Sequence, residues 1–322
     1  MREKNVMWEC GSMEPEYYAS QYRQYQSFCK NYSGNELYKI ACGPNADDTD
    51  WTRRLLSHLN STHASAISLH YYTVPTGDWS AKGAACVFDD ELYYKTLKST
   101  WFMKEILDKH IAVMNEFDPD NKIKLIVDEW GCWYDVEEGT NPGFLYQQNT
   151  MRDAMVAAIN LHLFNHYCER ICMANLAQVV NVLQSVVLTE GDRMVKTPTF
   201  YVFSLLKGHQ DATLIESSLV ATDVADKEGI PMLNHTVSRA KDGSYLLTVS
   251  NCSLSENEQL TVYGLKGNVL DAKILTGDVH DHNTFDNPDK VKPVEYTAYK
   301  ETEEGFELSV PPVSVISIHI EA

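Results

Sequence analysis

The stretch KLIVDEWGCW, Lys124 to Trp133, begins as an aliphatic run and ends on two adjacent carboxylates and a tryptophan. A short apolar run bounded in this way predicts a buried strand. In a parallel α/β barrel the functional side chains lie where each strand reaches its carboxyl end. Asp128 and Glu129 stand at that end here. The stretch therefore favours a buried strand that presents Glu129 to a site, while the alternative is that both carboxylates begin a solvated loop.

Three further strand-like runs alternate with helical segments in the first part of the chain. The four runs are LYKIACGP, AISLHYY, IKLIVDEW and RICMANLAQ, which start at residues 37, 66, 123 and 170. Helices are expected at about 16–32, 51–59, 92–116 and 148–167. Repeated βα units close with right-handed crossovers into a parallel sheet or barrel.

The pattern changes near residue 200. Short alternating runs follow, namely SYLLTVSNCS, EQLTVYGL, NVLDAKIL and FELSVPPVSVISIHI. Turn signals such as Asp242-Gly243 separate them, and this arrangement is typical of an antiparallel sandwich. We therefore expect an α/β domain at 1–198 and an all-β, jelly-roll-like sandwich at 199–322.

The net charge of the chain indicates which classes of partner are unfavourable. The chain has 322 residues, 44% of them hydrophobic, and a formal net charge of −18. This length can bury one large core or two ordinary ones. The negative charge disfavours nucleic acid and an anionic membrane as partners, because no cationic field attracts either. A neutral or cationic ligand fits better.

The cysteines indicate neither disulfides nor a metal site. Eight cysteines are scattered along the chain, which is typical of reduced thiols in a cytosolic protein. Cys168 and Cys172 could begin a metal site, but no second cysteine pair or closely spaced histidine pair completes it. We expect no metal and no cofactor. The start of the chain has no apolar core of signal-peptide length, and no later run reaches transmembrane length.

Other strand ends also carry polar and aromatic side chains. His70 and Tyr72 point to the same side of their strand, because strand side chains alternate with a period of two. Asn175 and Gln178 lie near the end of the fourth run. A histidine beside a tyrosine is, taken alone, more often a structural pair than a ligand contact. Together with Glu129 and the surrounding tryptophans these side chains describe a sugar site, in which aromatic faces meet the ring and polar groups meet hydroxyls. Those tryptophans are Trp8, Trp79, Trp130 and Trp133.

Several segments resemble the α-L-arabinofuranosidases of glycoside hydrolase family fifty-one. They are MEPEYYASQYRQYQSFC, LYKIACGPN, ISLHYYTVP, LIVDEWGCWYDVEEGTNPGFLYQQNTMRDAMVAA and MANLAQVVNVLQSVVLTEG. The resemblance runs from about Asn5 to the end of the chain and is strongest before the sandwich. It implies a (β/α)8 TIM-type barrel followed by a C-terminal β-sandwich. Only four barrel strands are visible here, so we expect the second half of the barrel.

The resemblance also implies an activity and its residues. The family consists of retaining, exo-acting hydrolases that release terminal arabinofuranosyl units from arabinan or arabinoxylan fragments, usually in the cytoplasm, and relatives commonly form hexamers. Glu129 would be the nucleophile. Asp128 is expected to be structural. The residues expected to contact substrate are Asn5, Trp8, His70, Tyr72, Trp130 and Gln178.

One family position departs from the pattern. The family's acid/base glutamate follows an asparagine and precedes a tryptophan and a Gly-Cys-Gly. The corresponding segment here is KNVMWECGSM, in which Asn5 and Trp8 align but Val6 occupies the place of the glutamate. Valine cannot donate a proton, so we expect a truncated and impaired enzyme. Glu3 and Glu9 are the available substitutes.

Two other classes stay open at this point. The chain could be a non-catalytic carbohydrate-binding remnant, because four parallel strands alone leave two unpaired edges. It could also be another retaining barrel glycosidase, such as an endoglucanase or a xylosidase, because loops rather than strand ends set the substrate.

Overall fold

The computed structural model describes residues 13–321 and divides the chain into two compact units. The first unit comprises the chain up to Tyr71 with Lys104–Asp128 and Glu169–Ala174. The second unit comprises Tyr72–Met103, Glu129–Cys168 and the chain from Asn175 onward. The expected domain ranges, 1–198 and 199–322, divide the chain differently and stay a proposal.

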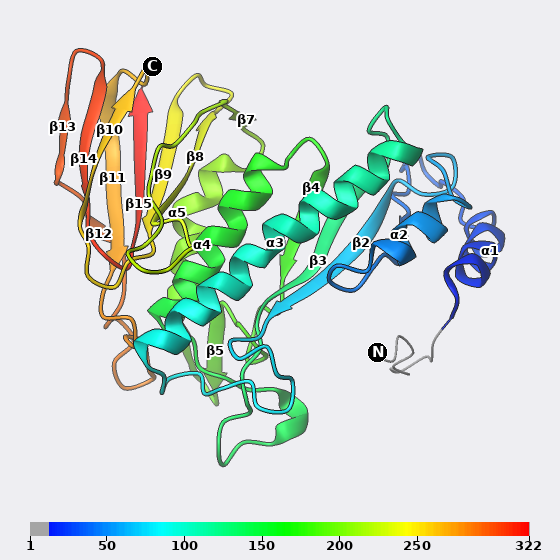
Figure 1. Cartoon of the computed structure of the whole chain (residues 1–322), viewed down its shortest axis with the longest axis horizontal. Coiled ribbons are helices and arrows are strands. Elements are labelled where there is room, and N and C mark those ends of the chain that lie inside the picture. Colours follow the sequence, from blue (N-terminus) through cyan, green and yellow to red (C-terminus); the bar gives the residue numbers. More distant parts are fainter. Residues whose placement is uncertain (1–12, 322) are drawn as a thin grey trace. The chain divides into compact units, whose positions relative to one another are not determined.

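A four-stranded sheet contains the predicted α/β strands. Its order is β1 (Ile40–Ala41), β2 (Ala66–Thr73), β3 (Lys124–Cys132) and β4 (Ile171–Leu176) (Figure 1). β1 and β2 are parallel. Hydrogen bonds join the start of β3 to Ser65, just before β2, and Trp133, just after β3, to the last residue of β2. β2 and β3 therefore run in the same direction, as predicted.

The predicted helices form with shifted ends. They are α1 (Pro15–Gln26), α2 (Thr49–Leu56), α3 (Asp90–Phe117) and α4 (Met151–His166). Proline stands in the first turn of α1, and the side chain of Asp48 caps α2 by accepting a hydrogen bond from the Trp51 amide. The expected extension of the first helix to about residue 32 is wrong. A turn closed by a hydrogen bond from Asn35 N to Tyr32 O lies there instead.

The strands after residue 206 form an antiparallel sandwich within the second unit. One sheet has the order β12-β11-β15-β9-β8-β7 and the other β10-β14-β13. Their bounds are β7 Thr213–Leu214, β8 Leu233–Arg239, β9 Tyr245–Asn251, β10 Glu258–Tyr263, β11 Asn268–Thr276, β12 Val294–Glu295, β13 Tyr299–Glu301, β14 Gly305–Val310 and β15 Ser314–Glu321. The predicted sandwich is confirmed, and β7, β8, β12 and β13 are additions that the sequence pattern did not indicate.

Short elements connect the sheets. The hairpin of β5 (Val187–Glu190) and β6 (Arg193–Lys196) precedes α5 (Pro198–Leu206), which a Thr197 cap starts. Single 3-10 turns form at Pro142–Phe144 (η1) and Lys207–His209 (η2). Sequence reasoning did not identify the hairpin or α5.

Helix α4 is the centre of the second unit. Almost all of its side chains are buried, because α5 covers one side and the sandwich strands β8, β9 and β15 cover another (Figure 1). The helix begins with a capping box, in which Thr150 and Asp153 each accept a hydrogen bond from the other's backbone. Since this cap fixes the start of α4, it also fixes the loop that leads to it from β3.

Among residues 13–321, no helix combines the length and the apolarity that crossing a membrane requires.

Buried histidines lie where α4 and η2 pack on the sandwich. His162 Nδ1 lies 2.8 Å from Thr236 Oγ1, and His209 Nδ1 lies 2.7 Å from Ser238 Oγ. Burial is the main cause that lowers the pKa of His209 to about 3 and that of His235 to about 4, and it holds the pKa of His162 well below its usual range. The neighbouring imidazoles of His166 and His319 add to these shifts. All three groups are therefore neutral in the folded protein near neutral pH.

This cluster predicts loss of stability in mild acid. Each histidine takes up a proton below about pH 6.5 when unfolded but not when folded, so the free energy of unfolding falls as the pH drops from about 6.5 toward 4. The slope approaches about 1.4 kcal/mol per pH unit for each histidine. Urea unfolding at pH 7 and at pH 5 measures this change in the free energy of unfolding.

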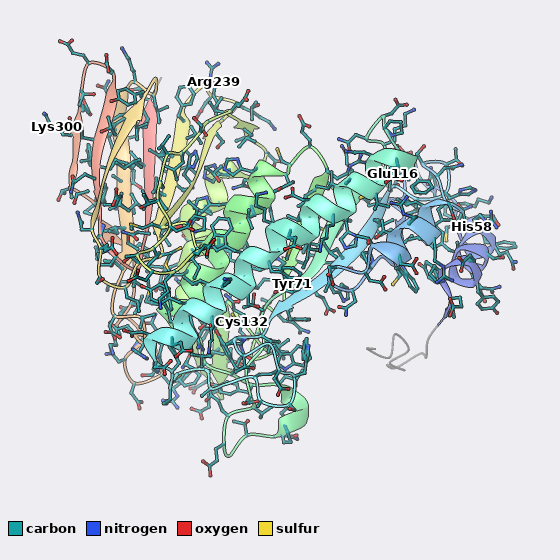
Figure 2. The ribbon with its side chains drawn as sticks, in the orientation of Figure 1. His58, Tyr71, Glu116, Cys132, Arg239 and Lys300 are labelled. Atoms are coloured by element: carbon teal, nitrogen blue, oxygen red, sulfur yellow. The ribbon has the colours of Figure 1, made fainter. Side chains whose placement is uncertain are left out.

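His209→Gln should reduce the pH dependence, whereas His58→Gln, at an exposed position labelled in Figure 2, should not. An unchanged slope in the His209 variant would contradict this account.

Candidate active site

Glu129 lies near the carboxyl end of β3, as the sequence predicts. Its carboxylate Oε2 accepts a 2.8 Å hydrogen bond from the hydroxyl of Tyr72, the next-to-last residue of β2. Both side chains are partly exposed. Residues 125–127 are buried, so β3 is a core strand that carries a partly exposed carboxylate near its carboxyl end. This is the arrangement that a nucleophile or a proton-transfer group requires.

His70 and Asp128 form a separate pair in the first unit. His70 Nε2 lies 2.9 Å from Asp128 Oδ1, and both side chains are about one-third exposed or slightly more. Asp128 therefore contacts an imidazole at the strand end, which fits the structural role expected for it. Tyr72, the second of two adjacent tyrosines near the end of β2, donates its hydroxyl hydrogen bond to Glu129.

Two tryptophans extend the site from Tyr72. The ring of Trp133 lies edge-on to Tyr72, with the centroids 4.9 Å apart, and Trp79 lies edge-on to Trp133 at 5.4 Å. The side chain of Trp79 is 55% exposed. We call Tyr72, Trp133 and Trp79 the aromatic wall. Exposed aromatic faces beside a carboxylate suit a sugar ring, which combines apolar faces with hydroxyls.

Trp130 does not belong to this site, contrary to the sequence-based expectation. Its indole is fully buried, stacks on Phe203 at 6.1 Å and meets Phe164 edge-on at 5.4 Å. Adjacent strand residues point to opposite faces, so Trp130 points away from the face of Glu129. It packs in the core of the second unit.

The remaining predicted residues lie farther along or outside the described range. Gln178 follows β4, is exposed, and its backbone N–H donates to Val182 O at 3.1 Å. Asn175 is exposed at the end of β4. Asn5, Val6 and Trp8, like the substitutes Glu3 and Glu9, lie outside residues 13–321, so their roles stay predictions.

Asp135 ties together the two loops of the aromatic wall, a role that sequence reasoning missed. Its carboxylate accepts hydrogen bonds from Lys82 N at 3.1 Å and Gly83 N at 2.9 Å, and its own N–H donates to Gly83 O at 2.9 Å. The first loop carries Trp79 and the second carries Trp133. The wall is therefore a fixed surface.

The site favours carboxylate chemistry. Burial raises the pKa of Cys132, labelled in Figure 2, so its thiol stays protonated and is a poor nucleophile or metal ligand. No group of three or more metal-ligating side chains occurs among the residues that the structure describes.

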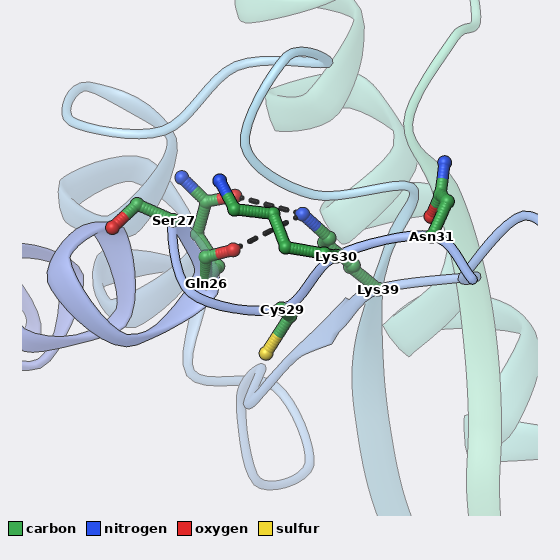
Figure 3. A pocket seen from close by; sticks show the side chains of 6 residues that line it. All are labelled: Gln26, Ser27, Cys29, Lys30, Asn31 and Lys39. Atoms are coloured by element: carbon green, nitrogen blue, oxygen red, sulfur yellow. Dashed lines mark hydrogen bonds between the residues drawn. The ribbon is translucent and has the colours of Figure 1, made fainter.

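A pocket of about 360 Å³ lies elsewhere, in the first unit (Figure 3). Lys39 Nζ donates there to the Gln26 carbonyl and to Gln26 Oε1 at 3.2 and 3.1 Å. The other lining residues are Ser27, Cys29, Lys30 and Asn31. None of the described residues that line this polar hollow has a carboxylate or an aromatic ring, so they do not offer the chemistry of the Glu129 site.

Comparison with known proteins identifies the family. A family model described as the α-L-arabinofuranosidase C-terminal domain matches residues 128–314, which is more than half of the chain. The chain belongs to the α-L-arabinofuranosidase family. The match begins at Asp128, directly before Glu129, and continues into the sandwich as far as Ser314, the first residue of β15.

Individual relatives agree with the family. An intracellular exo-α-L-arabinofuranosidase of Bacteroides ovatus is 41% identical, over 98% of this chain and 62% of that protein. The GH51 arabinofuranosidase of Xanthomonas axonopodis pv. citri superposes with a TM-score of 0.92 at 37% identity, over 98% of this chain and 64% of that one. An α-L-arabinofuranosidase of Thermotoga maritima, solved as an arabinose complex, gives a TM-score of 0.79 at 25% identity, over the same 98% and 64%. This arabinofuranosidase-family chain thus spans about three fifths of the length of these relatives.

Gly131, two residues after Glu129, offers a test of the strand end. Its φ of +134° disfavours other residues, and an added Cβ would lie 3.2 Å from Gln184 Oε1 and from Leu176 Cδ1. We expect Gly131→Ala to lower the free energy of unfolding by about 1–3 kcal/mol.

Gly139→Ala is the matched control, because Gly139 also has a positive φ but open space around its Cα. Urea unfolding should show the larger loss for Gly131. Equal losses would mean that close packing behind the strand end is unimportant.

Proposed function

We propose that the chain forms the C-terminal part of a retaining, exo-acting α-L-arabinofuranosidase of glycoside hydrolase family 51, with Glu129 as the nucleophile. The observation that carries this proposal is the Glu129 carboxylate near the end of a buried strand, bonded to Tyr72, whose ring meets Trp133 edge-on. The substrate would be the terminal arabinofuranosyl unit of arabinan or arabinoxylan fragments. The name of the Bacteroides ovatus relative supports this assignment and a cytoplasmic location.

The chemistry follows from the position of Glu129. In a retaining mechanism one carboxylate attacks the anomeric carbon and forms a covalent glycosyl-enzyme, which water then hydrolyses. Tyr72 holds one oxygen of the carboxylate and so orients the group for attack. The aromatic wall would contact the sugar and the group next to it. Trp133 thereby replaces Trp130 in the substrate-binding set, alongside the proposed His70, Tyr72 and Gln178.

The first unit supports the proposal that the four strands are half of a barrel. Eight large apolar side chains are exposed between residues 13 and 40, and Met173 on β4 is 47% exposed. The eight are Met13, Tyr17, Tyr25, Phe28, Tyr32, Leu37, Tyr38 and Ile40. Exposed apolar surface on this scale marks an interaction face. We propose that the part of the relatives that this chain does not span covers it, and that assembly into homo-oligomers is a separate property to measure.

A retaining mechanism also requires a second carboxyl group, which acts as the general acid and base. A retaining glycosidase needs it about 5 Å from the nucleophile, to protonate the leaving oxygen and then to activate water. We propose that Val6 occupies its place and that this substitution impairs the enzyme. Natural oligosaccharides would suffer most, because a sugar alcohol is a poor leaving group without a proton.

Removal of Glu129 tests the proposed role directly. In the full-length product of the gene, Glu129→Ala should lower the hydrolysis of an activated aryl arabinofuranoside by more than about 10⁴-fold. Azide should restore turnover, because it enters the space that the carboxylate leaves, and a single displacement then gives an arabinofuranosyl azide of inverted configuration.

Glu138→Ala, in the exposed loop after β3, is the control and should keep its activity without azide. Azide rescue of the Glu138 variant in place of the Glu129 variant would exclude Glu129 as the nucleophile.

Replacement of Val6 tests the proposed impairment. Val6→Glu should raise the rate on arabino-oligosaccharides by about 10²–10⁴-fold, the usual contribution of general acid catalysis. The first step on an activated aryl substrate should change much less, because its leaving group needs little protonation. Steady-state kinetics on both substrates measures the difference.

Glu9→Gln serves as the comparison and should have no effect on either substrate. If Glu9→Gln abolishes hydrolysis and Val6→Glu changes nothing, then Glu9 is the acid and the alignment of KNVMWECG is wrong.

A further inference from the structure

Two buried glutamines bind the main chain of the short segment Cys132–Tyr134, which follows Glu129 and carries Trp133. Gln147 Oε1 accepts a hydrogen bond from Tyr134 N at 3.0 Å, and Gln147 Nε2 donates to Cys132 O at 3.1 Å. One side-chain amide thus bonds to the backbone on both sides of Trp133. Gln147 is 2% exposed.

Gln184 holds the same segment from another element. Its Oε1 accepts a hydrogen bond from Cys132 N at 2.8 Å, while Nε2 donates to Asp153 O at 2.8 Å and to Thr199 Oγ1 at 3.1 Å. Its side chain is fully buried. Gln184 therefore connects the end of β3 to the first turns of α4 and α5.

These bonds occur where regular strand pairing ends. Trp133 N still donates to Thr73 O at 3.0 Å, but Cys132 and Tyr134 use glutamine side chains as partners. Buried backbone groups need such partners, and an amide side chain offers both an acceptor and donors. An ionised carboxylate of the same size offers acceptors only, so it cannot donate to Cys132 O.

We infer that Gln147 is a positioning residue for the sugar site, which it influences through Trp133. By fixing the backbone on both sides of Trp133, it sets the edge-on contact between Trp133 and Tyr72, and Tyr72 in turn binds Glu129. Gln147 precedes the capping box of α4, so the packing of that helix determines where the aromatic wall lies. The inference rests on the proposed function for the identity of the sugar.

Gln147→Glu is the sharpest test, because it keeps the size of the side chain and the acceptor for Tyr134 N. In its ionised form the new side chain has no donor for Cys132 O and places a carboxylate beside that carbonyl. In the full-length protein, the concentration of a fluorinated arabinofuranosyl inactivator that gives half-maximal inactivation should rise roughly 3- to 10-fold, the contribution of one well-placed aromatic contact. The limiting inactivation rate should change less.

A double-mutant cycle separates positioning from general destabilisation. Trp133→Ala should raise the same half-maximal concentration, and adding Gln147→Glu to it should raise it no further, because Gln147 acts through Trp133. Gln148→Glu is the matched control. It loses a comparable amide-to-carbonyl bond, to Asn283 O at 3.3 Å, without touching the Cys132–Tyr134 segment. It should leave the half-maximal concentration unchanged.

A second readout does not depend on the proposed activity. The side-chain N–H resonance of Trp133 should shift in Gln147→Glu and stay in place in Gln148→Glu. If the inactivator does not react with the wild-type protein, the proposed function fails while this resonance still tests the positioning. An unshifted Trp133 resonance, an unchanged half-maximal concentration, or full additivity with Trp133→Ala would overturn the inference.

Discussion

The hydrogen bond from Tyr72 to Glu129 is the contact on which the rest of the site depends. It joins the ends of two parallel strands, and it forms only because β2 and β3 reach the same edge of the sheet in the correct register. A carboxylate on a loop would move by more than the small tolerance that nucleophilic attack allows. Because residues 125–127 are buried in the core, the strand restricts the movement of Glu129 and fixes the direction of its carboxylate.

The second unit connects this strand end to the sandwich through hydrogen bonds to the main chain. Asp135 fixes the loop of Trp79, and the two glutamines fix the segment of Trp133. Gln184 also bonds to Asp153 in α4, Gln147 lies just before the cap of α4, and Asp135 bonds to the neighbouring loop at Gly83. Helix α4 is itself buried against the sandwich. By packing against α4, the sandwich therefore helps to fix the position of the residues around Glu129.

The sequence predicted the parts of this arrangement that follow a regular period. Continuous apolar runs indicated β2 and β3, the position near the strand end indicated Glu129, and the strand period of two indicated Tyr72. The same period of two, counted from Glu129, places Trp133 on the face of Glu129 and Trp130 on the opposite face, which the expectation for Trp130 overlooked. The roles of Gln147 and Gln184 were also invisible, since their partners are backbone atoms that become neighbours only in the folded chain. The family resemblance drew attention to Val6, but the described residues do not include it.

The most direct measurement is a crystal structure of the full-length protein after reaction with a fluorinated arabinofuranosyl inactivator. The account predicts a covalent bond between the anomeric carbon and the Glu129 carboxylate, with Tyr72 still bonded to that carboxylate and Trp133 beside the sugar. A sugar bonded to Asp128 or Glu138, or held away from the Tyr72–Glu129 pair, would contradict it.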